Sequence, residues 1–161
     1  MATHPPTRDS YQDVPLSALL YVTRGTYTAA VQRAQAKIGC ADVPAAAEVI
    51  LNAMEWSGAS LEAVVRFLGV SKQAVSQTVE TLVARGYLQR ARDPADRRRV
   101  KLSLTARGHA AGRAGRAAIE NVDRDLAARV GPQRVAHARA TLVALLQIKR
   151  GEPSRGRSEA A

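Results

Sequence analysis

The sequence has little of several residue types, and each shortage excludes a class of protein. A single cysteine, Cys40, cannot form an internal disulfide, and one Cys with three scattered His argues against a metal site. No window holds 18 uninterrupted apolar residues, and the first residues lack the apolar stretch of a signal peptide. We therefore expect a cytoplasmic protein with no metal, no cofactor and no membrane contact.

Aromatic residues are also scarce. They make up 4% of the 161 residues, with one Phe and one Trp, whereas 46% of all residues are hydrophobic. The core must therefore consist mostly of Ala, Val and Leu, which favours closely packed helices over a β sandwich. Carboxylates are scattered, and neither a Gly-rich phosphate loop nor a nucleophile elbow is present. These features predict a mainly α globular protein that is not an enzyme.

Positive charge is abundant. The chain has 24 Lys and Arg against 14 Asp and Glu, which gives a formal net charge of +10. Such an excess attracts polyanions, of which nucleic acid is the commonest. Residues 60–104 alone carry nine Lys or Arg and four Asp or Glu, so half of the net charge lies in this segment. This distribution directs attention to the middle of the chain.

Helical periodicity dominates on both sides of that segment. Residues 1–13 and 151–161 are polar ends without an apolar period, and we expect them to be flexible tails. Apolar steps of three and four predict a long helix within 14–40, which Gly39 ends, and another from Pro44 to about Ser57. Two further helices are expected within 105–150, one capped by Thr105 and one beginning at Gly131.

Three glycines, Gly108, Gly112 and Gly115, lie inside the expected helix after Thr105. Each would weaken an isolated helix by about 1 kcal/mol relative to Ala. Their presence therefore predicts that the backbone of this helix closely approaches a neighbouring element. A locally loose start of the helix is the alternative explanation.

The segment 41–104 combines short helices with a hairpin. A helix over 61–68 and a second helix from Ser71 to about Gly86, joined by a tight turn, form a helix-turn-helix. After Gly86 the apolar period changes to two, which predicts strands over 87–90 and 100–104 around an Asp-Pro turn. We expect a mainly α (α+β) fold: a winged helix-turn-helix domain between long N- and C-terminal dimerisation helices.

The tip of the hairpin carries the arginines of DPADRRRV. Alternation along a strand places Asp96 beside Arg98, where the two would pair and stiffen the tip. Arg97, Arg99 and Lys101 then share the other side, where they would reach a narrow minor groove and its phosphates. The alternative is that these arginines form only a solvated face.

The second helix of the helix-turn-helix has a polar side near its start. Residues off its apolar stripe are those that enter a major groove first, and here they are Ser71, Lys72, Gln73, Ser76 and Gln77. The two glutamines suit adenine edges, whereas the serines suit phosphates or either type of base. We interpret this side as the surface that reads DNA.

Residues 61–108 resemble the MarR family of bacterial transcription regulators. The resemblance lies in the helix-turn-helix, the ARGYL junction, the DPADRRR wing with its Asp-x-Arg pattern, and the closing SLTARG. It implies a homodimer, held by helices from 14–40 and 105–150, that binds a pseudopalindromic operator on double-stranded DNA and represses transcription. The family often has Arg where this sequence has Gln77, so a relative's target sequence does not transfer.

The resemblance also implies a small aromatic or anionic effector, bound between the dimerisation helices and the winged domain. The polar-aromatic candidates for this crevice are Tyr21, Tyr27, Trp56 and His109, each of which also suits a core, interface or solvated position. Cys40 suits either a thiol switch or a small buried residue, and no second cysteine is present to resolve an oxidised thiol. A protein-interaction module without specific DNA binding is the alternative function.

Overall fold

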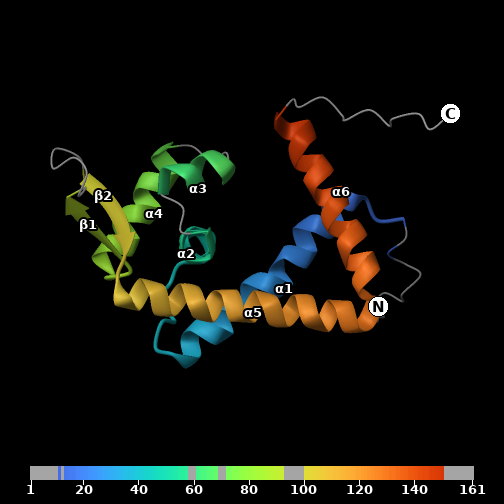
Figure 1. Cartoon of the computed structure of the whole chain (residues 1–161), viewed down its shortest axis with the longest axis horizontal. Coiled ribbons are helices and arrows are strands. Elements are labelled where there is room, and N and C mark those ends of the chain that lie inside the picture. The colour runs from blue at the N-terminus through green and yellow to red at the C-terminus, as the bar shows by residue number, and fades with distance from the viewer. Residues whose placement is uncertain (1–10, 12, 58–60, 69–71, 93–99, 151–161) are drawn as a thin grey trace, which may run out of the picture. The chain divides into compact units, whose positions relative to one another are not determined.

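The structure is a computed structural model, and it describes residues 11, 13–57, 61–68, 72–92 and 100–150. The chain divides into two compact units, residues 1–120 and 121–161, which are described separately below. The predicted fold class is confirmed: the elements are six helices and a single two-stranded hairpin within these residues (Figure 1). Their order is that of a winged helix-turn-helix between long helices.

Unit 1 contains most of the elements. In chain order they are α1 (Leu16–Lys37), α2 (Ala45–Ser57), α3 (Leu61–Leu68), α4 (Lys72–Ala84), β1 (Leu88–Arg92) and β2 (Val100–Leu104). Helix α5 (Ala106–Val130) begins in unit 1 and ends in unit 2, which also contains α6 (Pro132–Arg150). Within unit 1, the hairpin and α4 lie beside the amino-terminal end of α5 (Figure 1).

The hairpin is antiparallel, with Leu88 opposite Leu104 and Arg92 opposite Val100. The first strand begins one residue later than the sequence pattern predicts. The reason is that the N–H of Tyr87 donates to the carbonyl of Leu82, at 2.8 Å, so this residue is part of the cap that follows α4. Alternation then holds along β2, where Leu104 is buried and Lys101 is exposed.

The core of unit 1 joins α2, α3, α4, the hairpin and the start of α5. As the composition predicts, it is built mainly from aliphatic side chains, and Tyr87 is its only buried aromatic residue within the described part of the chain. Its members are Cys40, Val43, Ala47, Ile50, Leu51, Met54, Leu61, Val64, Val75, Val79, Leu82, Tyr87, Leu88, Leu104 and Ala111. A core of this kind fixes α4 against the hairpin through close packing.

The glycines of α5 make the close approach that the sequence predicts, and the neighbours are in the same chain. A Cβ atom at Gly108 would lie 2.1 Å from the carbonyl oxygen of Tyr87. At Gly112 it would lie 2.7 Å from the Cβ of Glu55, and at Gly115 it would lie 2.1 Å from Oδ1 of Asn52. Helix α5 therefore contacts α2 and the start of the hairpin through a side that admits no larger residue.

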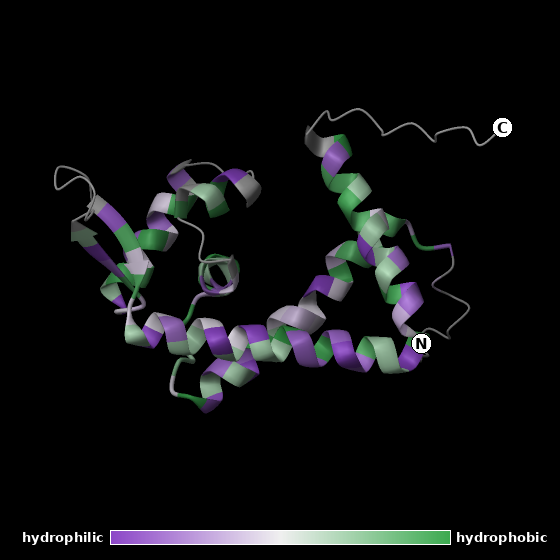
Figure 2. Cartoon of the chain, in the orientation of Figure 1, coloured by the Kyte–Doolittle hydropathy of each residue, from purple (hydrophilic) through white to green (hydrophobic). Residues whose placement is uncertain are grey.

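Unit 2 leaves large apolar side chains exposed. On α6 these are Leu142, Val143, Leu145, Leu146 and Ile148. In unit 1, α1 likewise exposes apolar side chains near its start, namely Leu16, Leu20, Tyr21 and Val22. Figure 2 shows hydrophobic residues along both helices. Contiguous exposed apolar side chains are a feature of surfaces that bind another protein.

The glycine contacts generate a stability prediction. Gly108→Ala should lower the free energy of unfolding by about 1–3 kcal/mol, because the added methyl group meets a backbone carbonyl that cannot rotate away. The control is Gly25→Ala in α1, where a Cβ would meet nothing within 4 Å. That control should be neutral or stabilise by up to about 1 kcal/mol. Urea denaturation of both variants measures the difference, and equal stabilities would contradict the packing of α5.

Candidate nucleic-acid interface

Helix α4 has one buried side and one exposed polar side. Val75, Val79 and Leu82 are buried in the core at spacings of four and three residues. Gln73, Ser76 and Gln77 are exposed on the other side. Lys72 and Ser71 are the other two predicted contact residues. Lys72 is the first residue of α4, and its side chain is not among the parts that the structure describes. Ser71 lies outside the described residues.

The carboxyl end of α4 is closed by a glycine cap. Gly86 has a φ of +72°, a left-handed conformation that other residues rarely adopt. The N–H of Gly86 donates to the carbonyl of Val83 at 3.0 Å, and the N–H of Tyr87 donates to that of Leu82 at 2.8 Å. These two bonds form a Schellman motif, which fixes the direction in which the chain leaves α4 for the hairpin.

The first residues of α5 bind the same helix end. The Thr105 hydroxyl donates to the carbonyl of Gly86 at 2.6 Å and accepts the N–H of Gly108 at 3.0 Å, so it also caps α5. The Arg107 guanidinium donates to the carbonyl of Arg85 at 3.1 Å. The carbonyls of Arg85 and Gly86, the two residues after α4, are therefore bonded by Thr105 and Arg107 at the start of α5.

Arg107 also connects this end of α4 to the loop between α1 and α2. Its guanidinium donates to Oδ1 of Asp42 at 2.8 Å, and it lies 4.5 Å from the centre of the Tyr87 ring. The Tyr87 hydroxyl donates to the same carboxylate at 2.5 Å, and Arg85 donates to the backbone carbonyl of Asp42. We call Asp42, Arg85, Tyr87 and Arg107 the junction cluster.

The junction cluster surrounds the carboxylate of Asp42 with hydrogen-bond donors and positive charge. The hydrogen bond from Tyr87, then a hydrogen bond from the backbone of Asp42 itself, and then the nearby Arg107 and Arg85 lower the pKa of Asp42. Burial, and then the hydrogen bond to Asp42, raises the pKa of the Tyr87 phenol. Asp42 is therefore ionised and Tyr87 neutral at physiological pH, which is the arrangement that these hydrogen bonds require.

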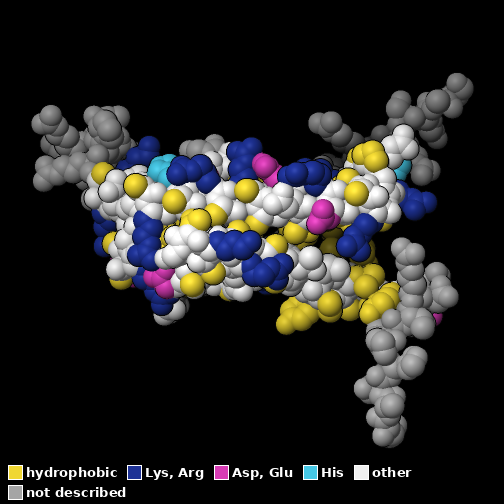
Figure 3. Space-filling model, turned by 90° about the horizontal axis from the view of Figure 1, so that it is seen from below, with side chains coloured by type: hydrophobic (Ala, Val, Ile, Leu, Met, Phe, Trp, Pro, Cys, Tyr) yellow, Lys and Arg dark blue, Asp and Glu magenta, His cyan; other side chains and the backbone are white. Residues whose placement is uncertain are grey.

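The hairpin presents charge beside α4. Lys101 on β2 is exposed, and Gln89 donates to the hydroxyl of Ser103 at 3.4 Å across the two strands. Arg90 on β1 pairs with Glu80 of α4, so the only acid in α4 is neutralised. The predicted tip residues, which are Asp96, Arg97, Arg98 and Arg99, lie outside the described residues. Figure 3 shows a different side, the one below α5 in Figure 1, where Lys and Arg also predominate among the charged side chains.

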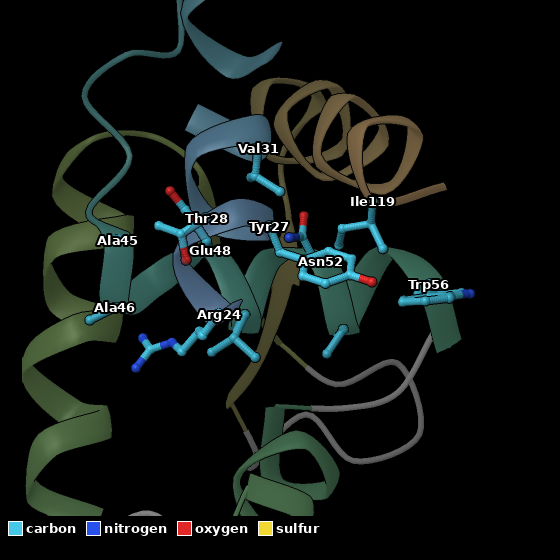
Figure 4. A pocket seen from close by; sticks show the side chains of 12 residues that line it. Arg24, Tyr27, Thr28, Val31, Ala45, Ala46, Glu48, Asn52, Trp56 and Ile119 are labelled. Carbon is cyan, nitrogen blue, oxygen red and sulfur yellow. The ribbon is translucent and has the colours of Figure 1, made fainter. Parts of the chain in front are cut away.

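A cavity of about 320 Å³ lies between α1, α2 and the first part of α5. Two of the four aromatic candidates, Tyr27 and Trp56, line it (Figure 4). The other two do not: Tyr21 is 81% exposed, and Nδ1 of His109 lies 2.6 Å from Oε2 of Glu55. We call this hollow the α1–α2 cavity.

Sequence reasoning missed several residues of the α1–α2 cavity. Among them are Arg24, Thr28, Glu48, Asn52 and Ile119. Glu48 and Asn52 carried a signal, because each is a polar residue within the otherwise apolar stretch of α2. Both are buried, and their side chains belong to the inner side of the helix. Periodicity alone could not show which helices face them.

Cys40 is 4% exposed and belongs to the core, where its thiol lies 3.9 Å from the carbonyl of Ile38. Among the described residues there is no group of three or more side chains that could hold a metal ion. No helix in the described ranges is long and apolar enough to cross a membrane.

Comparisons with known proteins agree with this architecture. A family model described as MarR family matches residues 42–99, which contain α2, α3, α4 and β1, the first strand of the hairpin. No curated protein matches the sequence.

Solved structures match over most of the chain. MepR of Staphylococcus aureus, in a complex with DNA, is 16% identical, covers 84% of this chain and 98% of its own, and has a TM-score of 0.66. A probable transcriptional regulator from Pseudomonas aeruginosa is 26% identical, covers 83% and 98%, and has a TM-score of 0.61. A MarR family protein of Mycobacterium tuberculosis, in complex with salicylic acid, is 25% identical, covers 83% and 98%, and has a TM-score of 0.56.

The sequence match identifies the segment around α4, and the structural matches extend the same fold over both flanking long helices. Residues 42–99 therefore match the MarR family, and the chain shares the fold of these solved structures over most of its length.

Proposed function

We propose that this protein is a cytoplasmic transcription regulator, a repressor, that binds a pseudopalindromic operator on double-stranded DNA as a homodimer. The observation that carries this proposal is the polar side of α4, where Gln73, Ser76 and Gln77 are exposed together. The opposite side is buried, and the junction cluster holds the end of the helix. A helix presented in this way suits a major groove. The DNA complex of MepR, which has the same fold, supports the proposal.

The wing is proposed to contact the flanking minor groove. Lys101 is exposed on β2, and the sequence continues this side of the strand through Arg99 and Arg97. Pairing of Asp96 with Arg98 remains our prediction for the stiffness of the tip. Contacts of this type are mainly with phosphates, and they supply affinity rather than sequence preference.

The proposed homodimer is supported by the exposed apolar side chains of α1 and, separately, of α6. Leaving such side chains in water is unfavourable by roughly 25 cal/mol for each Å² of apolar surface, so a second copy that covers them gains stability. Two copies related by a twofold axis would present two α4 helices to one operator.

A small molecule is proposed to bind in the α1–α2 cavity and release the protein from DNA. The cavity is within the usual range of ligand sites and combines mostly apolar walls with a few polar groups. The salicylic acid complex of the Mycobacterium tuberculosis relative supports binding of a small molecule. Tyr27 and Trp56 are the proposed aromatic contacts of the ligand.

Selection from a random duplex library tests the function directly. The purified protein, at near-physiological salt, should enrich an inverted repeat whose half-sites lie about one helical turn apart. The oligomeric state should be measured on the same preparation. Absence of enrichment by a folded dimer would overturn the proposal and favour a protein-interaction module.

Gln77 should determine base preference. Replacing Gln77 with Ala should reduce discrimination at one base pair of each half-site by about 1–3 kcal/mol, because a bidentate contact with adenine is lost. Gln133→Ala is the matched control, since Gln133 is an exposed glutamine at the start of α6. Competition binding with single-base operator variants measures the change. Equal preference in both variants would contradict a reading role for α4.

Lys101 should contribute affinity without sequence preference. If each subunit contacts roughly five phosphates, the plot of log affinity against log salt should have a slope near −9. Lys101→Ala should make this slope shallower by about 2, since each dimer loses two contacts. Arg134→Ala removes the same charge from the exposed surface of α6 and should leave the slope unchanged. Identical slopes for the two variants would exclude Lys101 from the interface.

A further inference from the structure

The α1–α2 cavity has an aromatic end and a polar end. Figure 4 shows Tyr27 and Ile119 near Trp56, whereas Thr28 and Glu48 lie together on the side away from Trp56. An aromatic ring that enters the cavity would therefore contact apolar and aromatic side chains first. The chemistry of the polar end then decides which substituent such a ring can carry.

Glu48 is the unusual group at the polar end. Glu48 is only 5% exposed, and its Oε1 atom has no hydrogen-bond partner among the described residues. A buried oxygen without a partner is unfavourable by roughly 1–3 kcal/mol. A molecule that brought an N–H donor to this oxygen would remove that cost. Neither apolar ligands nor carboxylates can do so.

The surroundings of Glu48 provide little positive charge of their own. Within the described residues, a hydrogen bond from Gln32 and the charge of Arg24, both on α1, are the groups that favour its ionised form. Burial outweighs both of them and raises the pKa of Glu48 to about 7. Arg24 is exposed, so water screens its charge, whereas Glu48 is screened much less. The buried carboxyl therefore determines which charge is accepted.

We infer that the α1–α2 cavity binds a small aromatic cation with N–H donors, such as an amidine or a benzylic amine. The donor meets Oε1 of Glu48 at the polar end, and the ring packs against Tyr27 and Trp56 at the aromatic end. This inference rests on the proposed ligand response of the same cavity and names the ligand class. It differs from the aromatic or anionic effector that the family resemblance implies.

The test compares benzamidine with benzoate, which has nearly the same shape and the opposite charge. Calorimetric titration of the full-length protein at pH 6 and pH 8 should show benzamidine binding the more tightly of the two. Its affinity should rise about tenfold from pH 6 to pH 8, because a cation binds the ionised form of Glu48, whose pKa lies between these values. Tighter binding of benzoate, or no binding of benzamidine at millimolar concentration, would overturn the inference.

A variant pair assigns the effect to Glu48. Glu48→Gln should weaken benzamidine at least tenfold at pH 8 and abolish the pH dependence. Glu55→Gln is the matched control, since Glu55 is on the same helix and pairs with His109 outside the cavity. It should leave benzamidine binding unchanged. Equal effects of the two substitutions would overturn the role of Glu48.

Protein stability gives a readout that needs no ligand. The pKa of Glu48 is about 7 in the folded protein and near 4.5 when unfolded, so the folded state holds the proton more tightly. Its contribution to stability is therefore present below about pH 4.5 and is lost as pH rises to about 7. At pH 8 the Glu48→Gln variant should unfold at a higher temperature than the wild type. The same measurement shows that the variant is folded. The operator selection is independent of these measurements, so failure of the ligand class is distinguishable from failure of DNA binding.

Discussion

The carboxyl end of α4 is where the winged domain is attached to the long helices, and hydrogen bonds from several segments converge there. The Gly86 cap turns the chain out of the helix, Thr105 bonds the carbonyl of Gly86, and Arg107 bonds that of Arg85. Arg107 continues to Asp42 in the loop after α1. The direction of α4 is therefore tied to both α1 and α5. Any shift of these helices against each other must change those bonds.

Small side chains also help to attach the winged domain to the long helices. With few aromatic residues available, the core is filled by Ala, Val and Leu, and such a core needs its helices close together. The glycines of α5 permit that approach, because nothing larger than hydrogen fits between Gly108 and the carbonyl of Tyr87. The loss of helix propensity at these positions is offset by contacts that a longer side chain would prevent.

Glu48 and Asn52 illustrate a different constraint, since both are polar residues on the inner side of α2. Apolar residues in their places would pack without unpaired oxygens and give a more stable domain. Their position next to the α1–α2 cavity is consistent with a site that gives up stability for binding chemistry. The proposed cation would contact α1 and α2, and the loop between these helices contains Asp42, which bonds Arg107 at the end of α4.

Much of this architecture follows from local properties of the sequence. Steps of three and four residues predicted the helices, Gly39 and Gly86 adopt the positive φ expected of helix ends, and Thr105 caps α5 as its position suggested. The contact surface on α4 was inferred in the same way, because a side that is polar in the sequence is exposed once the other side is buried. Interactions over short distances along the chain decide these features.

Other features depended on which segments meet in three dimensions. No pattern in the sequence connects Arg107 with Asp42, which is 65 positions away. Nor does any pattern show that the N–H of Tyr87 takes part in the cap of α4. Tyr27 and Trp56 were chosen for their chemistry alongside Tyr21 and His109, and only helix packing separates the two that line the cavity. The sequence by itself therefore determined the helices, the hairpin and the exposed side of α4. The tertiary structure decided the junction cluster and the burial of Glu48, because both arise where distant segments exclude water from one another.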